Sequence, residues 1–129
     1  MDTYMVAAGA LLLVVAAIHS ALGEILMFRH LRSHGLVPTL AAPPLKERHI
    51  RILWASWHVL TVLGWAFGAV LLRLAYPSDE HAICTFTEQA IVFAFLAGAL
   101  LVLVGTKGKH LGWVGLLGVA ALTWFASAA

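Results

Sequence analysis

Charged side chains are scarce in this chain. Asp, Glu, Lys and Arg make up 11% of its 129 residues, whereas 62% are hydrophobic, and the mean hydropathy is +0.94. An ordinary soluble domain carries about 25% charged residues, so this composition excludes a protein whose whole surface is wetted by water. The sequence therefore predicts an integral membrane protein with the lipid bilayer as its solvent.

Cysteine is also nearly absent, and several motifs are missing. The single cysteine, Cys84, excludes an internal disulfide and a CxxC redox motif. There is no glycine-rich phosphate-binding loop and no G-x-S-x-G nucleophile motif. The N-terminus has Asp2 where a signal peptide carries positive charge, and it lacks a clear cleavage motif, so we expect it to remain as the first span.

Four apolar segments are long enough to be considered as spans, at about residues 4–28, 52–76, 87–104 and 111–127. The connections between them are short, apart from residues 29–51, which contain three of the four prolines. Short connections predict an all-α, up-down antiparallel bundle of four transmembrane helices, forming one domain over residues 1–129. Small residues spaced four apart are typical of close helix contacts, and they occur as Ala17 and Ala21, Gly64 and Gly68, and Ala94 and Gly98.

The basic residues predict the orientation. Seven of the eight Lys and Arg, all but Arg73, lie in or beside the first and third connections, and the positive-inside rule places those connections in the cytoplasm. Both termini are then periplasmic, an N-out/C-out topology with 29–51 as the cytoplasmic loop. Because the basic residues follow the membrane pattern, we expect no nucleic-acid partner. Compactness and the lack of organelle signals favour a bacterial inner membrane.

Histidines gather toward the predicted cytoplasmic half. His19 and His58 are inside the first and second spans, about 15 Å and 10 Å along the helix axis from Arg29 and Arg51. Similar depth on adjacent helices predicts that these two side chains approach each other. Glu24 is five residues after His19, and a closed bundle, in which the first helix touches both the second and the fourth, could turn both groups inward.

Polar and aromatic residues on the second span share a helical face. They are Arg51, Trp54, His58, Thr61 and Trp65, spaced three or four apart, and we expect this face to point inward. Ionisable groups inside the hydrocarbon cost about 2.5 to 3.5 kcal/mol each, which makes them a functional-site hypothesis. The candidates for a substrate pocket are Arg51 and Trp54 at its mouth, with Ser20 and Thr61.

Two imidazoles and a carboxylate suit a transition metal. His19, His58 and Glu24 could hold zinc, iron or copper, with His30 and His49 available from the rim. Alternatively His19 and His58 could be the axial ligands of haem b. Either cofactor would support redox chemistry or a reaction on a lipid-soluble molecule such as a quinone or an acyl chain.

Other interpretations stay open. His19 and His58 could form interhelical hydrogen bonds alone, and Glu24 could pair with Arg29 or Arg51. The chain could be a proton- or ion-conducting homo-oligomer that uses His and Glu as relays, or a non-catalytic structural subunit that binds another membrane protein. Spans three and four offer few polar groups, so we expect any site to lie between the first two spans.

Overall fold

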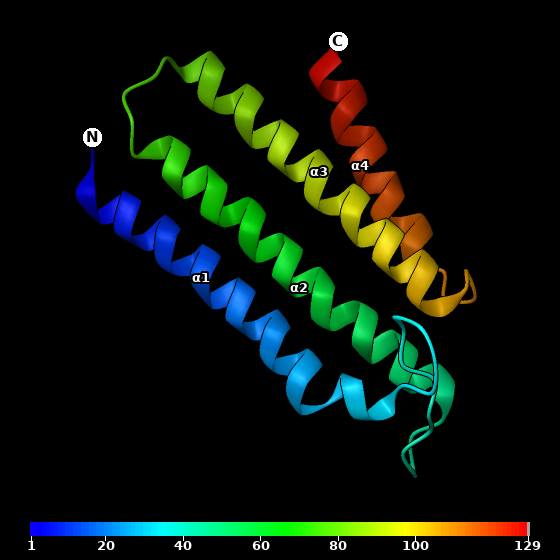
Figure 1. Cartoon of the computed structure of the whole chain (residues 1–129). Helices are drawn as coiled ribbons and strands as arrows, with labels where there is room; N and C mark the ends of the chain where they lie inside the picture. Colours follow the sequence, from blue (N-terminus) through cyan, green and yellow to red (C-terminus); the bar gives the residue numbers. More distant parts are fainter. Residues whose placement is uncertain (129) are drawn as a thin grey trace.

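The computed structural model describes residues 1–128, which form helices joined by turns and one long loop (Figure 1). The elements are α1 (Thr3–Leu26), the 3-10 helix η1 (Phe28–Leu31), α2 (Glu47–Leu74), α3 (Glu80–Thr106) and α4 (Gly112–Ala128). No strand occurs among these residues. The prediction of an all-helical fold with four principal helices is confirmed.

Three of the helices are long and apolar enough to cross a membrane. They are α1, α2 and α3, with 24, 28 and 27 residues. The fourth helix, α4, is equally apolar but has 17 residues, which at about 1.5 Å per residue gives about 26 Å, less than the hydrocarbon thickness of about 30 Å. The composition and length of the helices therefore support three spans directly.

Helices α2 and α3 begin earlier than the apolar segments predict. Helix α2 starts at Glu47 rather than at residue 52, and α3 starts at Glu80 rather than at residue 87. Polar groups make these extensions, because Asp79 accepts a hydrogen bond from the backbone of Ala82 at 2.8 Å and so caps the first turn of α3. Hydropathy marks the part of a helix suited to lipid, whereas the helix itself continues into its polar cap.

Consecutive helices run antiparallel and pack on each other in chain order, α1 on α2, α2 on α3 and α3 on α4 (Figure 1). Within the described residues, α1 makes no extensive contact with α4. The expectation of a closed bundle with α1 against α4 is therefore wrong, because α4 packs along α3. The result is an open row of helices in which α2 is covered on both sides.

Small residues set the spacing between α1 and α2. A Cβ atom on Gly68 would lie 2.8 Å from Leu13, and one on Gly64 would lie 2.9 Å from Ala16. The predicted packing role of Gly64 and Gly68 is confirmed, whereas Ala17 and Ala21 are exposed. On α3, Ala94 and Gly98 are buried as predicted.

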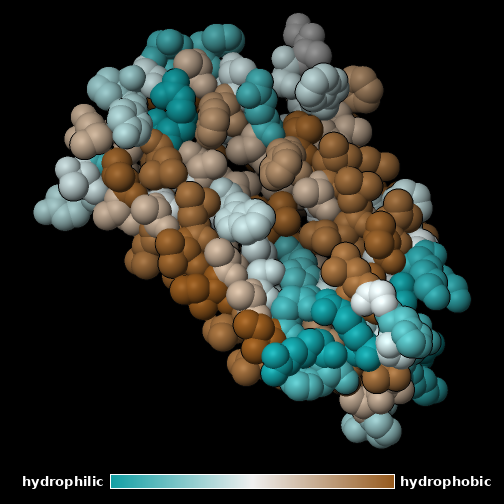
Figure 2. Space-filling view, in the orientation of Figure 1, coloured by the Kyte–Doolittle hydropathy of each residue, from teal (hydrophilic) through white to brown (hydrophobic). Residues whose placement is uncertain are grey.

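Both ends of the molecule are more polar than its middle. Figure 2 shows hydrophobic residues along the length of the helices and hydrophilic residues gathered toward the two ends. At the end that carries the long loop, a small core joins η1, α2 and α3, and it consists of Phe28, Trp54, Ala55 and Val102. This core fixes the helix ends beside the polar cluster described below.

Candidate functional site

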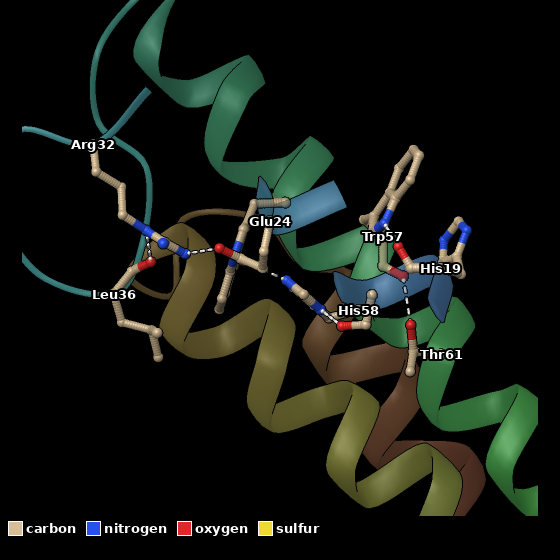
Figure 3. A network of polar contacts seen from close by, with 9 residues as sticks. His19, Glu24, Arg32, Leu36, Trp57, His58 and Thr61 are labelled. Carbon is tan, nitrogen blue, oxygen red and sulfur yellow. Dashed lines mark hydrogen bonds and ion pairs between the residues drawn. The ribbon is translucent and has the colours of Figure 1, made fainter. Parts of the chain in front are cut away.

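A chain of hydrogen bonds crosses from α1 to α2 through the ring of His58 (Figure 3). His58 Nδ1 lies 2.8 Å from the Ser20 hydroxyl, and His58 Nε2 lies 2.8 Å from Glu24 Oε1. An ionised carboxylate can only accept, so Nε2–H donates to Glu24, and in the neutral ring Nδ1 then accepts from Ser20. One imidazole reaches both groups because Ser20 and Glu24 are one helical turn apart.

Glu24 is surrounded by donors. Besides His58, the indole Nε1–H of Trp54 donates to Oε1 at 2.7 Å, and Arg32 forms an ion pair with Oε2. Arg32 is held in turn by the hydrogen bond from its Nε–H to the carbonyl of Leu36, at 2.5 Å. The Glu24 side chain is 27% exposed and that of His58 is 14% exposed, so the charge is partly buried and compensated by three donors.

The end of α1 explains how Arg32 reaches Glu24. The α-helix stops at Leu26, and the short η1 turns the chain. Phe28, fully buried in the core, anchors this turn, while the carbonyl of Leu31 accepts the backbone N–H groups of Thr39 and Leu40 at 2.9 Å each. The loop therefore returns Arg32 toward the helix that it has just left.

Trp57 forms a second contact between the two helices. Its ring stacks on His19, with centroids 4.2 Å apart and an interplanar angle of 9°. Its Nε1–H donates to the backbone carbonyl of His19 at 2.9 Å. The indole fills the space left by Gly23, since a Cβ atom there would lie 2.2 Å from Trp57 Nε1. Buried His19 Nε2 has no hydrogen-bond partner within residues 1–128.

A groove of about 320 Å³ lies beside this stacked pair, and it is lined by His19, Leu22, Gly23, Leu26, Met27 and Trp57. In Figure 3, His58 points toward Glu24, whereas the ring of His19 lies against Trp57. Trp57 contacts His19 on one side and precedes His58 in α2. Trp57 is therefore a wall of the groove, and buried Phe28 lies beside both rings, with centroids 6.0 Å from Trp57 and 6.1 Å from His58.

The structure brings together four of the residues that the sequence singled out, Ser20, Glu24, Trp54 and His58. The hydroxyl of Thr61 is buried and donates instead to the carbonyl of Trp57, at 3.5 Å.

Three finer expectations are corrected. Glu24 pairs with Arg32 rather than with Arg29 or Arg51, because η1 turns Arg29 toward His30, whose Nε2 lies 3.2 Å from Arg29 Nε. Arg51 is buried away from the cluster and contacts Glu47 at 3.5 Å. Trp65 does not face inward and is 44% exposed.

The arrangement does not fit the expected metal or haem ligands. Both ring nitrogens of His58 are engaged, and His19 is stacked on Trp57. His30 is exposed on η1, and His49 Nδ1 accepts from the backbone of Lys46 at 3.3 Å. Among residues 1–128, no three His, Cys, Asp or Glu side chains are grouped to hold a metal ion. Zinc, iron, copper or haem b as a cofactor stays a prediction that this geometry does not support.

The order Ser20, His58 and Glu24 is reminiscent of the nucleophile, base and carboxylate of hydrolases. Acyl transfer also needs donors for the developing oxyanion. Ser20 lies inside α1, where backbone N–H groups are already used within the helix. The site therefore lacks the backbone donors of an oxyanion hole, and proton exchange is the simpler chemistry for the same three groups.

Arg32 and Trp57 are not among the site residues that the sequence predicts. The position of Arg32 depends on the turn at η1, for which hydropathy gives no signal. Trp57 could have been found from its spacing, because it is three residues after Trp54 in the second apolar segment. Comparison of the chain with protein-family models, with curated proteins and with solved structures finds no match.

Proposed function

We propose that this chain is an integral membrane protein that exchanges a proton at the Glu24–His58 pair and couples it to a lipid-soluble molecule bound in the groove beside Trp57. The observation that carries the proposal is the His58 ring, which is hydrogen-bonded through both nitrogens between a carboxylate and a hydroxyl. Such a ring can accept a proton at one nitrogen and release one from the other. Ionisable groups inside the hydrocarbon are costly to insert, and this cost makes the Glu24–His58 pair a functional-site hypothesis.

Protons would arrive from the end with the long loop. Arg32 is 21% exposed and contacts Glu24 directly, so the carboxylate has a path to water at this end. Toward the opposite end the polar groups stop at Ser20 and Thr61, beyond which α1 and α2 pack through small and apolar residues such as Ala16 and Gly64. One copy of the chain therefore supports a proton site open to one side, and conduction across the membrane would need a further polar route from a second copy.

The groove suits an apolar ligand with a polar head. Most of its lining is hydrophobic, and His19 and Trp57 supply the aromatic surface. A quinone headgroup could lie against that surface, with its tail in lipid along α1. Protonation of His58 would change how α2 is held against α1. Because Trp57 is the preceding residue in α2, this change would alter the wall of the groove.

Binding of decylubiquinone tests this proposal, because the oxidised probe has no group that titrates near neutral pH. In nanodiscs, its dissociation constant is read from quenching of tryptophan fluorescence between about pH 5 and pH 8, where histidine changes charge. We expect the constant to change by about fivefold or more across this range, the low end of ordinary coupling between two sites. His58→Gln should retain binding but remove the pH dependence.

His30→Gln is the matched control, because His30 is exposed on η1 and its loss should leave the pH dependence intact. Trp57→Phe should remove most of the quenching, whereas Trp124→Phe, in exposed α4 surface, should not. Binding that is independent of pH in the unaltered chain, or no binding at all, would show that the cluster only ties α1 to α2.

The orientation can be tested with the natural cysteine. We propose a bacterial inner-membrane location with both termini periplasmic, on the positive-inside argument, which puts exposed Cys84, near the start of α3, at the periplasmic end. A membrane-impermeant maleimide should label it in intact cells. With Cys84→Ser and Lys107→Cys combined, labelling should require permeabilised cells, and the reverse pattern would invert the topology.

A further inference from the structure

A basic pocket of about 600 Å³ lies between the start of α2 and the turn that joins α3 to α4. It is distinct from the groove beside Trp57. Four cations and two histidines line it, against a single carboxylate, and its polar lining consists of Glu47, Arg48, His49, Arg51, Thr106, Lys107, Lys109 and His110. This excess of positive charge around one cavity indicates a site for an anion.

Arg51 is the strongest sign of a ligand-binding site. The residue is 7% exposed, yet its Nε–H has no partner among the described residues. The other two guanidinium nitrogens make long contacts, from Nη2 to the carbonyl of Val104 at 3.4 Å and from Nη1 to Glu47 at 3.5 Å. Charge-assisted hydrogen bonds are normally about 2.7 to 2.9 Å long, so this buried cation is poorly compensated.

We propose that this pocket binds a phosphate group, either in the headgroup of an anionic lipid or in a free phosphate compound. The planar guanidinium of Arg51 would bind two phosphate oxygens. Lys107 and Lys109 would add point charges from the opposite wall, across from the first turn of α2. The positive end of the α2 dipole favours an anion at the same place.

The position of the pocket favours a lipid headgroup over a free anion. The basic residues belong to the hydrophilic end of the molecule that also carries the long loop (Figures 1 and 2), and the apolar parts of α2 and α3 continue directly from it. If these helices cross a bilayer, the pocket lies at the level of the lipid phosphates. Basic pockets between helices at this level are typical sites for anionic headgroups.

Two arms of one experiment distinguish a lipid headgroup from a free phosphate compound as the ligand. In the first, the chain in a neutral detergent is mixed with phosphatidylglycerol or phosphatidylcholine, and the retained lipid is counted by native mass spectrometry. In the second, inorganic phosphate is added without lipid and thermal unfolding is followed. Lys109→Gln changes an exposed residue, and this variant should fold normally. Arg51→Lys keeps the buried positive charge but removes the planar guanidinium.

We expect preferential retention of phosphatidylglycerol, reduced about fivefold by Lys109→Gln, as expected for one basic residue near a lipid phosphate, and reduced by Arg51→Lys. The matched control is Arg29→Gln, which removes an exposed charge at the same end but outside the pocket and should have little effect. Stabilisation by inorganic phosphate alone, lost in the same variants, would assign the site to a free phosphate compound. The proposal would be overturned if the chain showed neither preferential retention of phosphatidylglycerol nor stabilisation by inorganic phosphate. It would also be overturned if Arg29→Gln reduced lipid retention as much as the pocket variants do.

Discussion

Replacement of Gly23 by leucine is expected to separate α1 from α2 at the site. The first added atom would lie 2.2 Å from Nε1 and 2.7 Å from Cε2 of Trp57, and the indole is fixed by its stacking on His19 and its bond to the His19 carbonyl. Overpacking of a close contact costs about 1 to 3 kcal/mol, and more where the obstacle is rigid. We expect a loss at the upper end of that range.

The measurement is the free energy of unfolding from a titration with sodium dodecyl sulfate in mixed micelles. Gly115→Leu and Gly118→Leu are matched controls on α4, where a Cβ atom would meet nothing within 4 Å. All three changes bring the same gain in helix propensity. Equal stabilities for Gly23→Leu and the two controls would contradict the close packing of α1 on Trp57.

Glu24→Leu is expected to have a similar or larger effect, because it leaves three donors without their acceptor. The indole of Trp54, the ring of His58 and the guanidinium of Arg32 all lose a partner. Each unsatisfied buried group costs about 1 to 3 kcal/mol, and Arg32, the most exposed of the three donors, can turn to water. We therefore expect a total loss of about 3 kcal/mol in the same titration.

A double-mutant cycle with His58→Leu isolates the contribution of the Glu24–His58 pair. Interhelical hydrogen bonds in membranes have a coupling energy of about 0.6 kcal/mol on average and up to about 1.7 kcal/mol, and we expect the upper value here.

Glu24→Gln should reduce the free energy of unfolding less than Glu24→Leu, since the amide oxygen can still accept one hydrogen bond. The control is Glu88→Leu on α3, whose carboxylate forms no ion pair within residues 1–128. Additive losses would show that the pair is not coupled.

Much of the fold can be predicted from the sequence, because hydropathy and helix length depend on local composition. The apolar segments locate α1, α2, α3 and α4, but α2 and α3 start earlier because Glu47 and Glu80 belong to polar first turns. The row arrangement of the helices could not be predicted. Whether α4 packs against α1 or only along α3 depends on tertiary contacts that no periodicity encodes.

The site was predictable to the extent that depth and helical spacing determine it. His58, Ser20 and Glu24 meet because the spacing of one turn on α1 matches the reach of one imidazole. His19 was expected at the same place, yet it lies against Trp57 because Gly23 leaves room there for an indole. The spacing of histidines alone does not reveal which neighbouring side chain a histidine ring will contact.

Measurement of the protonation of His58 in a lipid bilayer tests proton exchange at the Glu24–His58 pair most directly. Solid-state NMR of chain labelled with ¹⁵N at the histidine rings, assigned by comparison with His58→Gln, reports the proton at each nitrogen. Spectra are recorded between about pH 5 and pH 8, where histidine side chains in general change charge, and we predict that Glu24→Gln and decylubiquinone each change the protonation of the His58 ring within this range. A His58 ring whose protonation stays fixed throughout this range, with and without the probe, would contradict a proton-exchanging site.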